Sequence, residues 1–269
     1  MNILTLKPSP DLSKRQKIIV STVIFTASFL LATQKANIVF HRFYLIYAMG
    51  LLAYLLSLWS LWEGMTRQKA VVLLILPTLF SIGATSFYFT FREIRWLTRL
   101  PASFILGFMF YTLLLSQNVF NVAEIRTIPL YRAAATASFV FTLVTAFFLF
   151  GIIYTLNLPF YWNGLAVFLI SFLLILQSLW TIEMEGIKPS LILYSLILSL
   201  VIGEGALALS FWPVVTTIWS LFLSASLYIC VGILTESLRE RLGRRMVGEY
   251  AVVGIVVMLV TIFATSWTG

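Results

Sequence analysis

Residues 132–182 read RAAATASFVFTLVTAFFLFGIIYTLNLPFYWNGLAVFLISFLLILQSLWTI, a nearly unbroken apolar run. A helix needs about 20 apolar residues to cross the roughly 30 Å hydrocarbon core of a membrane. This run is therefore too long for one crossing and long enough for two. Its polar and interfacial side chains cluster at 157–163, where Pro159 also lacks a backbone donor. We place the turn between two spanning helices there.

The rest of the chain repeats this pattern. Residues 190–234 form a second overlong apolar run, which we divide at Pro213. The sequence thus predicts an all-α, polytopic membrane helix bundle with about nine transmembrane helices, preceded by a cytoplasmic N-terminal tail at 1–17 and forming one transmembrane domain over 18–269. The predicted spans are 18–34, 43–62, 70–91, 100–118, 132–155, 160–182, 190–210, 213–234 and 248–267.

Composition excludes several classes of protein. Of the 269 residues, 61% are hydrophobic and 10% are charged, with a mean hydropathy of +1.00. Soluble domains carry about 25% charged residues, so a water-soluble fold is excluded. The chain has one histidine, one cysteine and one aspartate, which excludes an internal disulfide and leaves too few ligands for a zinc site. We expect no metal site and no cofactor.

Basic residues set the predicted orientation. With the N-terminus in the cytoplasm, 13 of the 18 lysines and arginines fall in inner segments and 5 in outer ones. If the first span failed to cross, the split would become 9 against 9, which removes the usual cytoplasmic excess. We expect a multi-pass protein of a prokaryotic plasma membrane with its C-terminus outside, in contact with anionic inner-leaflet lipids. No basic run with interleaved aromatics indicates a nucleic-acid partner.

Two stretches of the sequence resemble each other. Ser60-Leu61-Trp62 leads to Glu63-Gly64 and later to Ile82-Gly83, and Ser178-Leu179-Trp180 leads to Glu185-Gly186 and later to Ile202-Gly203. The match pairs the second and third spans with the sixth and seventh. An offset of four crossings keeps both copies in one orientation, which is a parallel repeat. We state a four-plus-four repeat with one added helix as a hypothesis; chance recurrence of common apolar residues is the alternative.

Glu204 is the one ionisable residue well inside a predicted span, flanked by Gly203 and Gly205. Charged groups within a membrane are costly and mark candidate functional sites. Glycines weaken a helix and can free backbone carbonyls, as in discontinuous transporter helices. One hypothesis is a substrate or proton site at these three residues. The other is a protonated or hydrogen-bonded glutamate that reaches Thr216 or Thr217, or that extends to water.

The segment 235–247 is the most basic inner connection. Its leucines recur every four residues, which predicts a short amphipathic helix on the membrane surface. Four arginines are candidates for lipid-headgroup contact, with a docking site for a partner protein as the alternative. They are Arg239, Arg241, Arg244 and Arg245.

Two further features carry hypotheses. The inner loop 118–132 carries Glu124, Arg126 and Arg132. One hypothesis is that they bind a phosphate or another anion; the alternative is that they only mark the cytoplasmic face. Gln177, within the sixth span, predicts a hydrogen bond between helices, because buried amides in lipid seek partners.

Two functions from different classes remain. Compact form, the repeat and Glu204 favour a transporter or permease-like protein for a small or lipidic substrate. Scarce intramembrane polarity favours a non-catalytic structural or assembly subunit that binds a membrane-protein partner. Enzymatic activity stays open, but the sequence offers no Ser-His-Asp set and no aspartate-rich motif, so we predict no catalytic residue.

Overall fold

The computed structural model describes residues 13–35, 39–90, 96–123, 130–184, 186–240 and 243–265. In these residues the structure is helices and turns without strands, and nine helices are long and apolar enough to cross a membrane. The predicted all-α bundle is confirmed for this part of the chain. The helices are α1 Lys14–Lys35, α2 Val39–Leu61, α3 Arg67–Thr90, α4 Trp96–Ala123, α5 Tyr131–Thr155, α6 Phe160–Glu183, α7 Pro189–Leu209, α8 Thr216–Leu238 and α9 Arg244–Phe263.

Local sequence explains where several helices begin. The Ser13 backbone N–H donates to Gln16 Oε1 at 2.8 Å, one half of a capping box that starts α1. The predicted break between α5 and α6 is confirmed: Asn157 has a φ of +49°, and Pro159 is extended immediately before α6. Helix α7 has Pro189 at its first position, where the missing donor is not needed.

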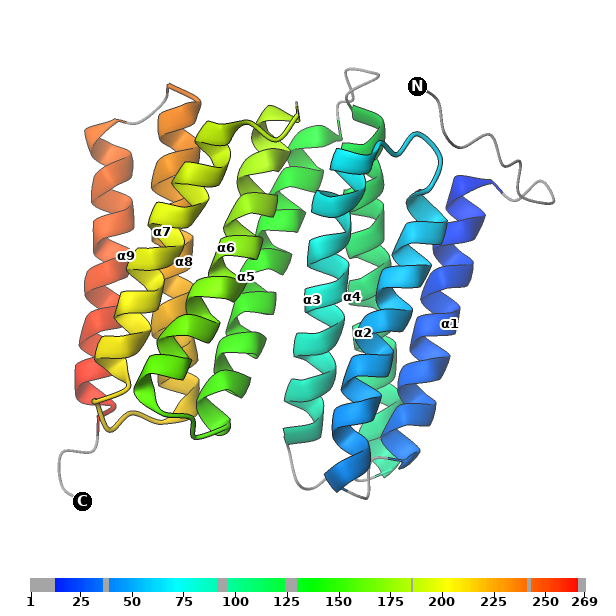
Figure 1. Cartoon of the computed structure of the whole chain (residues 1–269), viewed down its shortest axis with the longest axis horizontal. Helices are drawn as coiled ribbons and strands as arrows, with labels where there is room; N and C mark the ends of the chain where they lie inside the picture. The colour runs from blue at the N-terminus through cyan, green and yellow to red at the C-terminus, as the bar shows by residue number, and fades with distance from the viewer. Residues whose placement is uncertain are drawn as a thin grey trace.

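Successive helices run in opposite directions, so α1, α3, α5, α7 and α9 all begin at one end of the bundle (Figure 1). We call this the basic end, because most of the described lysines and arginines lie there. They include Lys14, Arg15, Lys17, Lys69, Arg132, Lys188, Arg239, Arg244 and Arg245. The opposite end, here the far end, holds Arg42 and Arg99 among the described residues.

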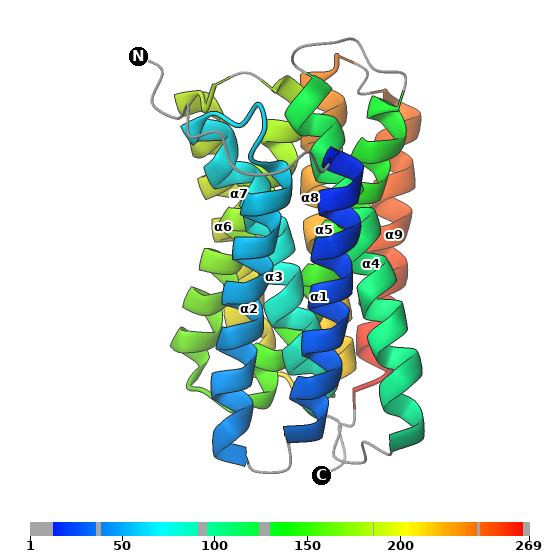
Figure 2. The same ribbon diagram turned by 90° about the vertical axis from the view of Figure 1, so that its right-hand side faces the viewer.

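The nine helices form two units of four and one added helix. In the first unit α1 packs on α2 and α4, while α2 and α4 both pack on α3. In the second unit α5 packs on α6 and α8, while α6 and α8 both pack on α7. The units meet where α3 contacts α5 and α6 and where α4 contacts α5, and α9 packs on α8. In Figure 2 the first unit lies in front, with α1 and α2 nearest the viewer, and the second unit lies behind it. The neighbours in one unit match those in the other, which supports the hypothesis of a parallel repeat.

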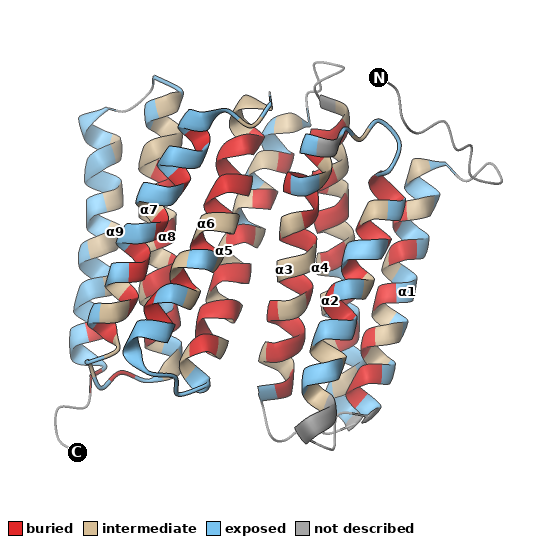
Figure 3. Cartoon of the chain, in the orientation of Figure 1, coloured by how far each residue is buried: buried red, intermediate tan, exposed pale blue. Residues whose placement is uncertain are grey.

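Burial is concentrated at the centre of the bundle and is lowest at its edge. Where the units meet, the fully buried ring of Phe80 in α3 packs against Phe141 of α5, with ring centroids 5.8 Å apart. In contrast, only 6% of the residues in the most apolar part of α9 are buried (Figure 3). An apolar helix that is exposed to this degree faces lipid or another protein.

The surface helix predicted for 235–247 is wrong. Helix α8 continues to Leu238, the chain turns at Arg239 and Glu240, and α9 already begins at Arg244. Glu240 has a φ of +56°, a left-handed conformation that ends the helix. The four-residue leucine spacing is therefore split between the ends of two spanning helices.

Candidate functional site

A cleft of about 770 Å³ opens between the second unit and α9, among α5, α6, α8 and α9. We call it the basic-end pocket, since its charged side chains lie at the helix ends there. The polar wall comprises Tyr131, Arg132, Tyr228, Glu236, Arg239 and Tyr250. Apolar side chains line the same cleft: Ile182 near the end of α6, and Phe139 about two turns into α5.

Helical spacing brings these polar side chains together. Tyr131 and Arg132 are the first two residues of α5, and Glu236 lies in the last turn of α8. Tyr228, Gly232 and Glu236 are spaced by four residues, which places them on one face of α8. Tyr250 comes from the second turn of α9.

Gly232 allows Tyr250 to lie close against α8. A Cβ atom at position 232 would be 2.5 Å from Tyr250 Cε1 and 2.6 Å from its hydroxyl oxygen. The Tyr250 ring also packs on Tyr228, with ring centroids 5.4 Å apart. The missing side chain therefore positions two tyrosine rings side by side in the pocket wall.

The charged groups of the pocket are only loosely paired. Arg239 Nη1 lies 3.8 Å from Glu236 Oε1, too far for a strong charge-assisted hydrogen bond. The Arg239 guanidinium also lies beside the Tyr131 hydroxyl, which donates to the carbonyl oxygen of Thr181 at 2.6 Å. The pocket thus combines two guanidinium groups, one carboxylate and three phenol rings.

A buried polar network lies where α4, α5 and α6 meet. Ser138 Oγ lies 3.4 Å from Gln117 Nε2 and 3.3 Å from Gln177 Nε2. Thr142 Oγ1 lies 3.4 Å from Gln177 Oε1 and donates to the Ser138 carbonyl oxygen at 2.9 Å. The hydrogen bond predicted for Gln177 between helices is therefore confirmed. This network joins the two units below the pocket.

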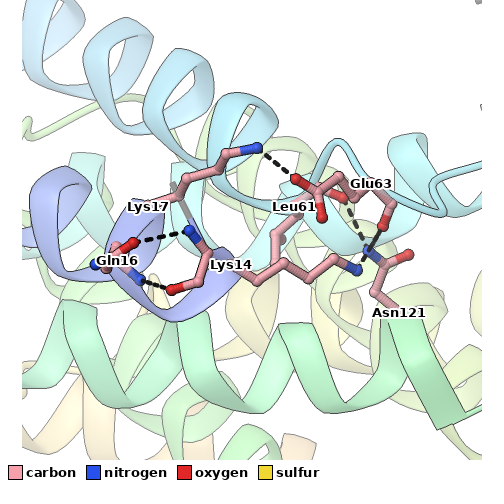
Figure 4. A network of polar contacts seen from close by, with 7 residues as sticks. Lys14, Gln16, Lys17, Leu61, Glu63 and Asn121 are labelled. Carbon is pink, nitrogen blue, oxygen red and sulfur yellow. Dashed lines mark hydrogen bonds and ion pairs between the residues drawn. The ribbon is translucent and has the colours of Figure 1, made fainter. Parts of the chain in front are cut away.

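The corresponding end of the first unit is closed by polar contacts (Figure 4). Lys14 Nζ donates to the Glu63 carbonyl oxygen at 2.8 Å, and Lys17 pairs with the Glu63 carboxylate. Asn121 Nδ2 donates to the carbonyl oxygens of Leu61 at 2.8 Å and Glu63 at 3.1 Å. We call these contacts the first-unit seal; they join α1, the α2–α3 connection and α4.

The structure places the three residues predicted around Glu204 on different surfaces. Helix α7 runs without interruption through all three, so the expected break in the helix is not formed. The side chain of Glu204 is exposed and has no hydrogen bond to Thr216 or Thr217 among the described residues. Gly203 is buried: its Cβ would lie 3.0 Å from Phe168 Cβ and 3.2 Å from the Gly164 carbonyl oxygen. Gly205 is half-buried and loosely packed.

The four candidate headgroup arginines separate into two places. Arg239 lies in the basic-end pocket. Arg244 and Arg245 are exposed in the first turn of α9, where Arg245 Nε lies 3.3 Å from Glu249 Oε1. Arg241 lies outside the described residues. Arg132, from the anion-binding site considered for 118–132, lines the pocket. The other two residues of that site, Glu124 and Arg126, also fall outside the described residues.

Sequence reasoning missed three members of the pocket: Tyr228, Glu236 and Tyr250. The available signals were the four-residue spacing of Tyr228, Gly232 and Glu236 along α8 and the position of Tyr250 in the second turn of α9. Among the described residues, no group of three or more histidine, cysteine, aspartate or glutamate side chains has the geometry to hold a metal ion.

The nine helices of the described residues have the length and composition that suit a multi-pass helical membrane protein. The chain belongs to the family described as protein of unknown function DUF5656, whose model matches residues 62–264. This match includes every residue named for the basic-end pocket and leaves out α1 and α2. No curated protein and no solved structure matches the chain.

Proposed function

We propose that this protein is a permease-like carrier that binds a small or lipidic substrate through an anionic group in the basic-end pocket. The observation that carries the proposal is the convergence of Arg132 and Arg239 in one cleft with aromatic walls. Guanidinium groups bind phosphate and carboxylate through paired hydrogen bonds. A cleft of about 770 Å³ is of the size that holds a small ligand or a lipid headgroup.

The position of the pocket favours an amphipathic substrate. Its charged side chains lie at the helix ends, while Ala135 and Phe139 line it one and two turns further along α5. A molecule with a polar head and an apolar tail satisfies both regions, because the tail needs no polar partner. The scarcity of other charged groups inside the spans disfavours a strongly hydrophilic substrate.

The proposal includes an orientation. We place the basic end in the cytoplasm of a prokaryotic cell, the C-terminus outside, and the pocket at the level of the anionic headgroups of the inner leaflet. The excess of lysine and arginine at the basic end supports this placement.

The test is lipid binding and transfer in reconstituted vesicles. Arg132→Gln and Arg239→Gln should each weaken binding of a phosphate-bearing lipid by roughly tenfold, since one charge-assisted hydrogen bond contributes about 1.5 kcal/mol or more. Transfer of a fluorescent lipid between leaflets should also be slower in both variants than in the wild-type protein. Arg15→Gln is the matched control, because Arg15 is exposed at the same end outside the pocket. Equal binding by all three variants would reject the site.

A structural or assembly role is the second candidate, and one observation favours it. Glu204 is exposed on α7, whereas Ala84, its counterpart in the repeat, is buried in the core. A carboxylate on an exposed apolar surface is suited to a neighbouring helix with a hydrogen-bond donor. A photocrosslinker at position 204 should then label one protein, and Glu204→Gln should abolish that complex without changing lipid binding. Loss of lipid transfer in Glu204→Gln would instead favour a coupling carboxylate.

A further inference from the structure

We propose that the basic-end pocket selects a headgroup that carries both a phosphate and an ammonium group, as in phosphoethanolamine lipids. The inference rests on the proposed function, because it assigns a substrate class to the same pocket. Its starting point is that the pocket holds a carboxylate as well as two arginines. A site for a purely anionic headgroup would be weakened by that carboxylate, since like charges repel across a small cleft.

Arg132 and Arg239 form the half of the pocket that binds the phosphate. They come from the start of α5 and from the turn after α8, so they reach the cleft from different helices. Two guanidinium groups can share the oxygens of one phosphate. Arg239 is also held beside the Tyr131 hydroxyl, and the bond from that hydroxyl to Thr181 keeps the phenol in place.

Glu236, Tyr228 and Tyr250 form the half of the pocket that binds the ammonium group. The two rings lie with centroids 5.4 Å apart, and all three side chains line the cleft. An ammonium group is attracted to tyrosine faces and more strongly to a carboxylate beside them. Only 16% of the Glu236 side chain is exposed, so solvent screens this attraction less than it would at an open surface.

The loose pair of Glu236 and Arg239 matches a zwitterion. Their closest charged atoms are 3.8 Å apart, so each group is available to a stronger partner. On binding, Arg239 takes the phosphate and Glu236 takes the ammonium group, and no net charge is added to the pocket. Side chains three residues apart on a helix have Cβ atoms about 5–6 Å apart, a spacing that a headgroup with two carbons between phosphate and nitrogen can bridge.

The experiment measures the affinity of the purified protein for lipids in mixed micelles. One arm uses a phosphoethanolamine lipid, a second uses a phosphoglycerol lipid with identical chains, and a third uses soluble glycerophosphoethanolamine. We expect the first to bind roughly tenfold more tightly than the second, which corresponds to one additional ionic contact. Weaker binding in the third arm identifies a lipid headgroup as the ligand; equal binding in the first and third arms identifies the free headgroup.

Variants separate the two halves of the pocket. Glu236→Gln should lower affinity for the phosphoethanolamine lipid by about tenfold and leave or raise affinity for the phosphoglycerol lipid. Tyr250→Leu should produce a smaller loss of the same kind, because it removes one ring face. Glu249→Gln is the matched control, since Glu249 is exposed outside the pocket and pairs with Arg245. Helical content and elution volume identify any variant that fails to fold.

Two failures are distinguishable. Equal affinity for the two lipids in the wild-type protein, or an unchanged preference in Glu236→Gln, would overturn the zwitterion inference while the anion site stands. Absence of binding to either lipid would overturn the proposed function itself.

Discussion

The two four-helix units have the same pattern of neighbours, yet their basic ends differ. In the first unit, Lys14, Lys17 and Asn121 bind the α2–α3 connection and close the end. In the second unit, Arg132 lines an open cleft together with Glu236. Where cationic side chains meet the neighbouring loop, they stabilise the fold; where they face a cleft instead, they are available to a ligand. Under the proposed function, the first unit supports the structure and the second unit carries the binding site.

The largest expected effect is a difference in water access between Ser178 and Ser60, which correspond in the repeat. Ser178 lines the pocket although only 8% of it is exposed, whereas Ser60, near the first-unit seal, is 1% exposed. In a Cys230→Ala background, Ser178→Cys should react with a small, water-soluble thiol reagent and Ser60→Cys should not. Mass spectrometry of the labelled protein measures both. Equal labelling of the two sites would remove the distinction between an open and a closed end.

The next effect concerns the stability of the closed end. Asn121→Ala removes two hydrogen bonds to backbone carbonyls and should lower the free energy of unfolding by about 1–3 kcal/mol. Tyr131→Phe removes one comparable bond at the open end and should cost about 0.5–1.5 kcal/mol. Denaturation in detergent measures both variants. A larger loss for Tyr131→Phe would contradict the assignment of the first unit as the supporting one.

The junction of the two units should respond more weakly. Gln177→Leu removes the amide that connects Ser138 and Thr142. Hydrogen bonds between helices in membranes contribute about 0.6 kcal/mol and at most about 1.7 kcal/mol, so we expect a small drop in unfolding temperature with lipid binding retained. Loss of binding in this variant would show that the network belongs to the site rather than to the support.

The smallest effect is expected for the ion pair of the first-unit seal. Glu63 is about half exposed, so Lys17→Gln should change stability by at most about 1 kcal/mol. The difference from wild type should shrink further in high salt, because screening weakens exposed pairs. Unfolding at two salt concentrations tests this; a large effect that is independent of salt would contradict it.

Much of the architecture was predictable from the sequence. Apolar length located all nine helices, and Pro159 located the turn within the quoted run. The errors occur at helix ends: α4 continues to Ala123, past its predicted end at 118. Hydropathy marks where lipid contact ends, but backbone hydrogen bonds continue the helix, and here they bring Asn121 to the first-unit seal.

The candidate site was predicted only in fragments. Arg132 and Arg239 were each noted, but 107 positions separate them in the chain, and no local pattern joins them. Glu204 was identified as the unusual charge of its span, but the face on which it lies was not predicted. Helix α7 carries small residues spaced by four at Ser195, Ser199 and Gly203, and all three are buried. Small residues of this kind mark a helix-packing face, and Glu204, one position beyond Gly203, lies on the exposed side.

What the sequence alone determined is the number of segments long and apolar enough to cross a membrane, because a backbone in lipid must satisfy its hydrogen bonds within helices of about 20 residues. The tertiary structure decided which helix ends meet, which faces are buried and that the described end of the first unit carries the first-unit seal while a cleft opens beside the second unit. These outcomes depend on the rotation and packing of helices around one another, and side-chain contacts such as the fit of Tyr250 over Gly232 exist only after the helices have packed.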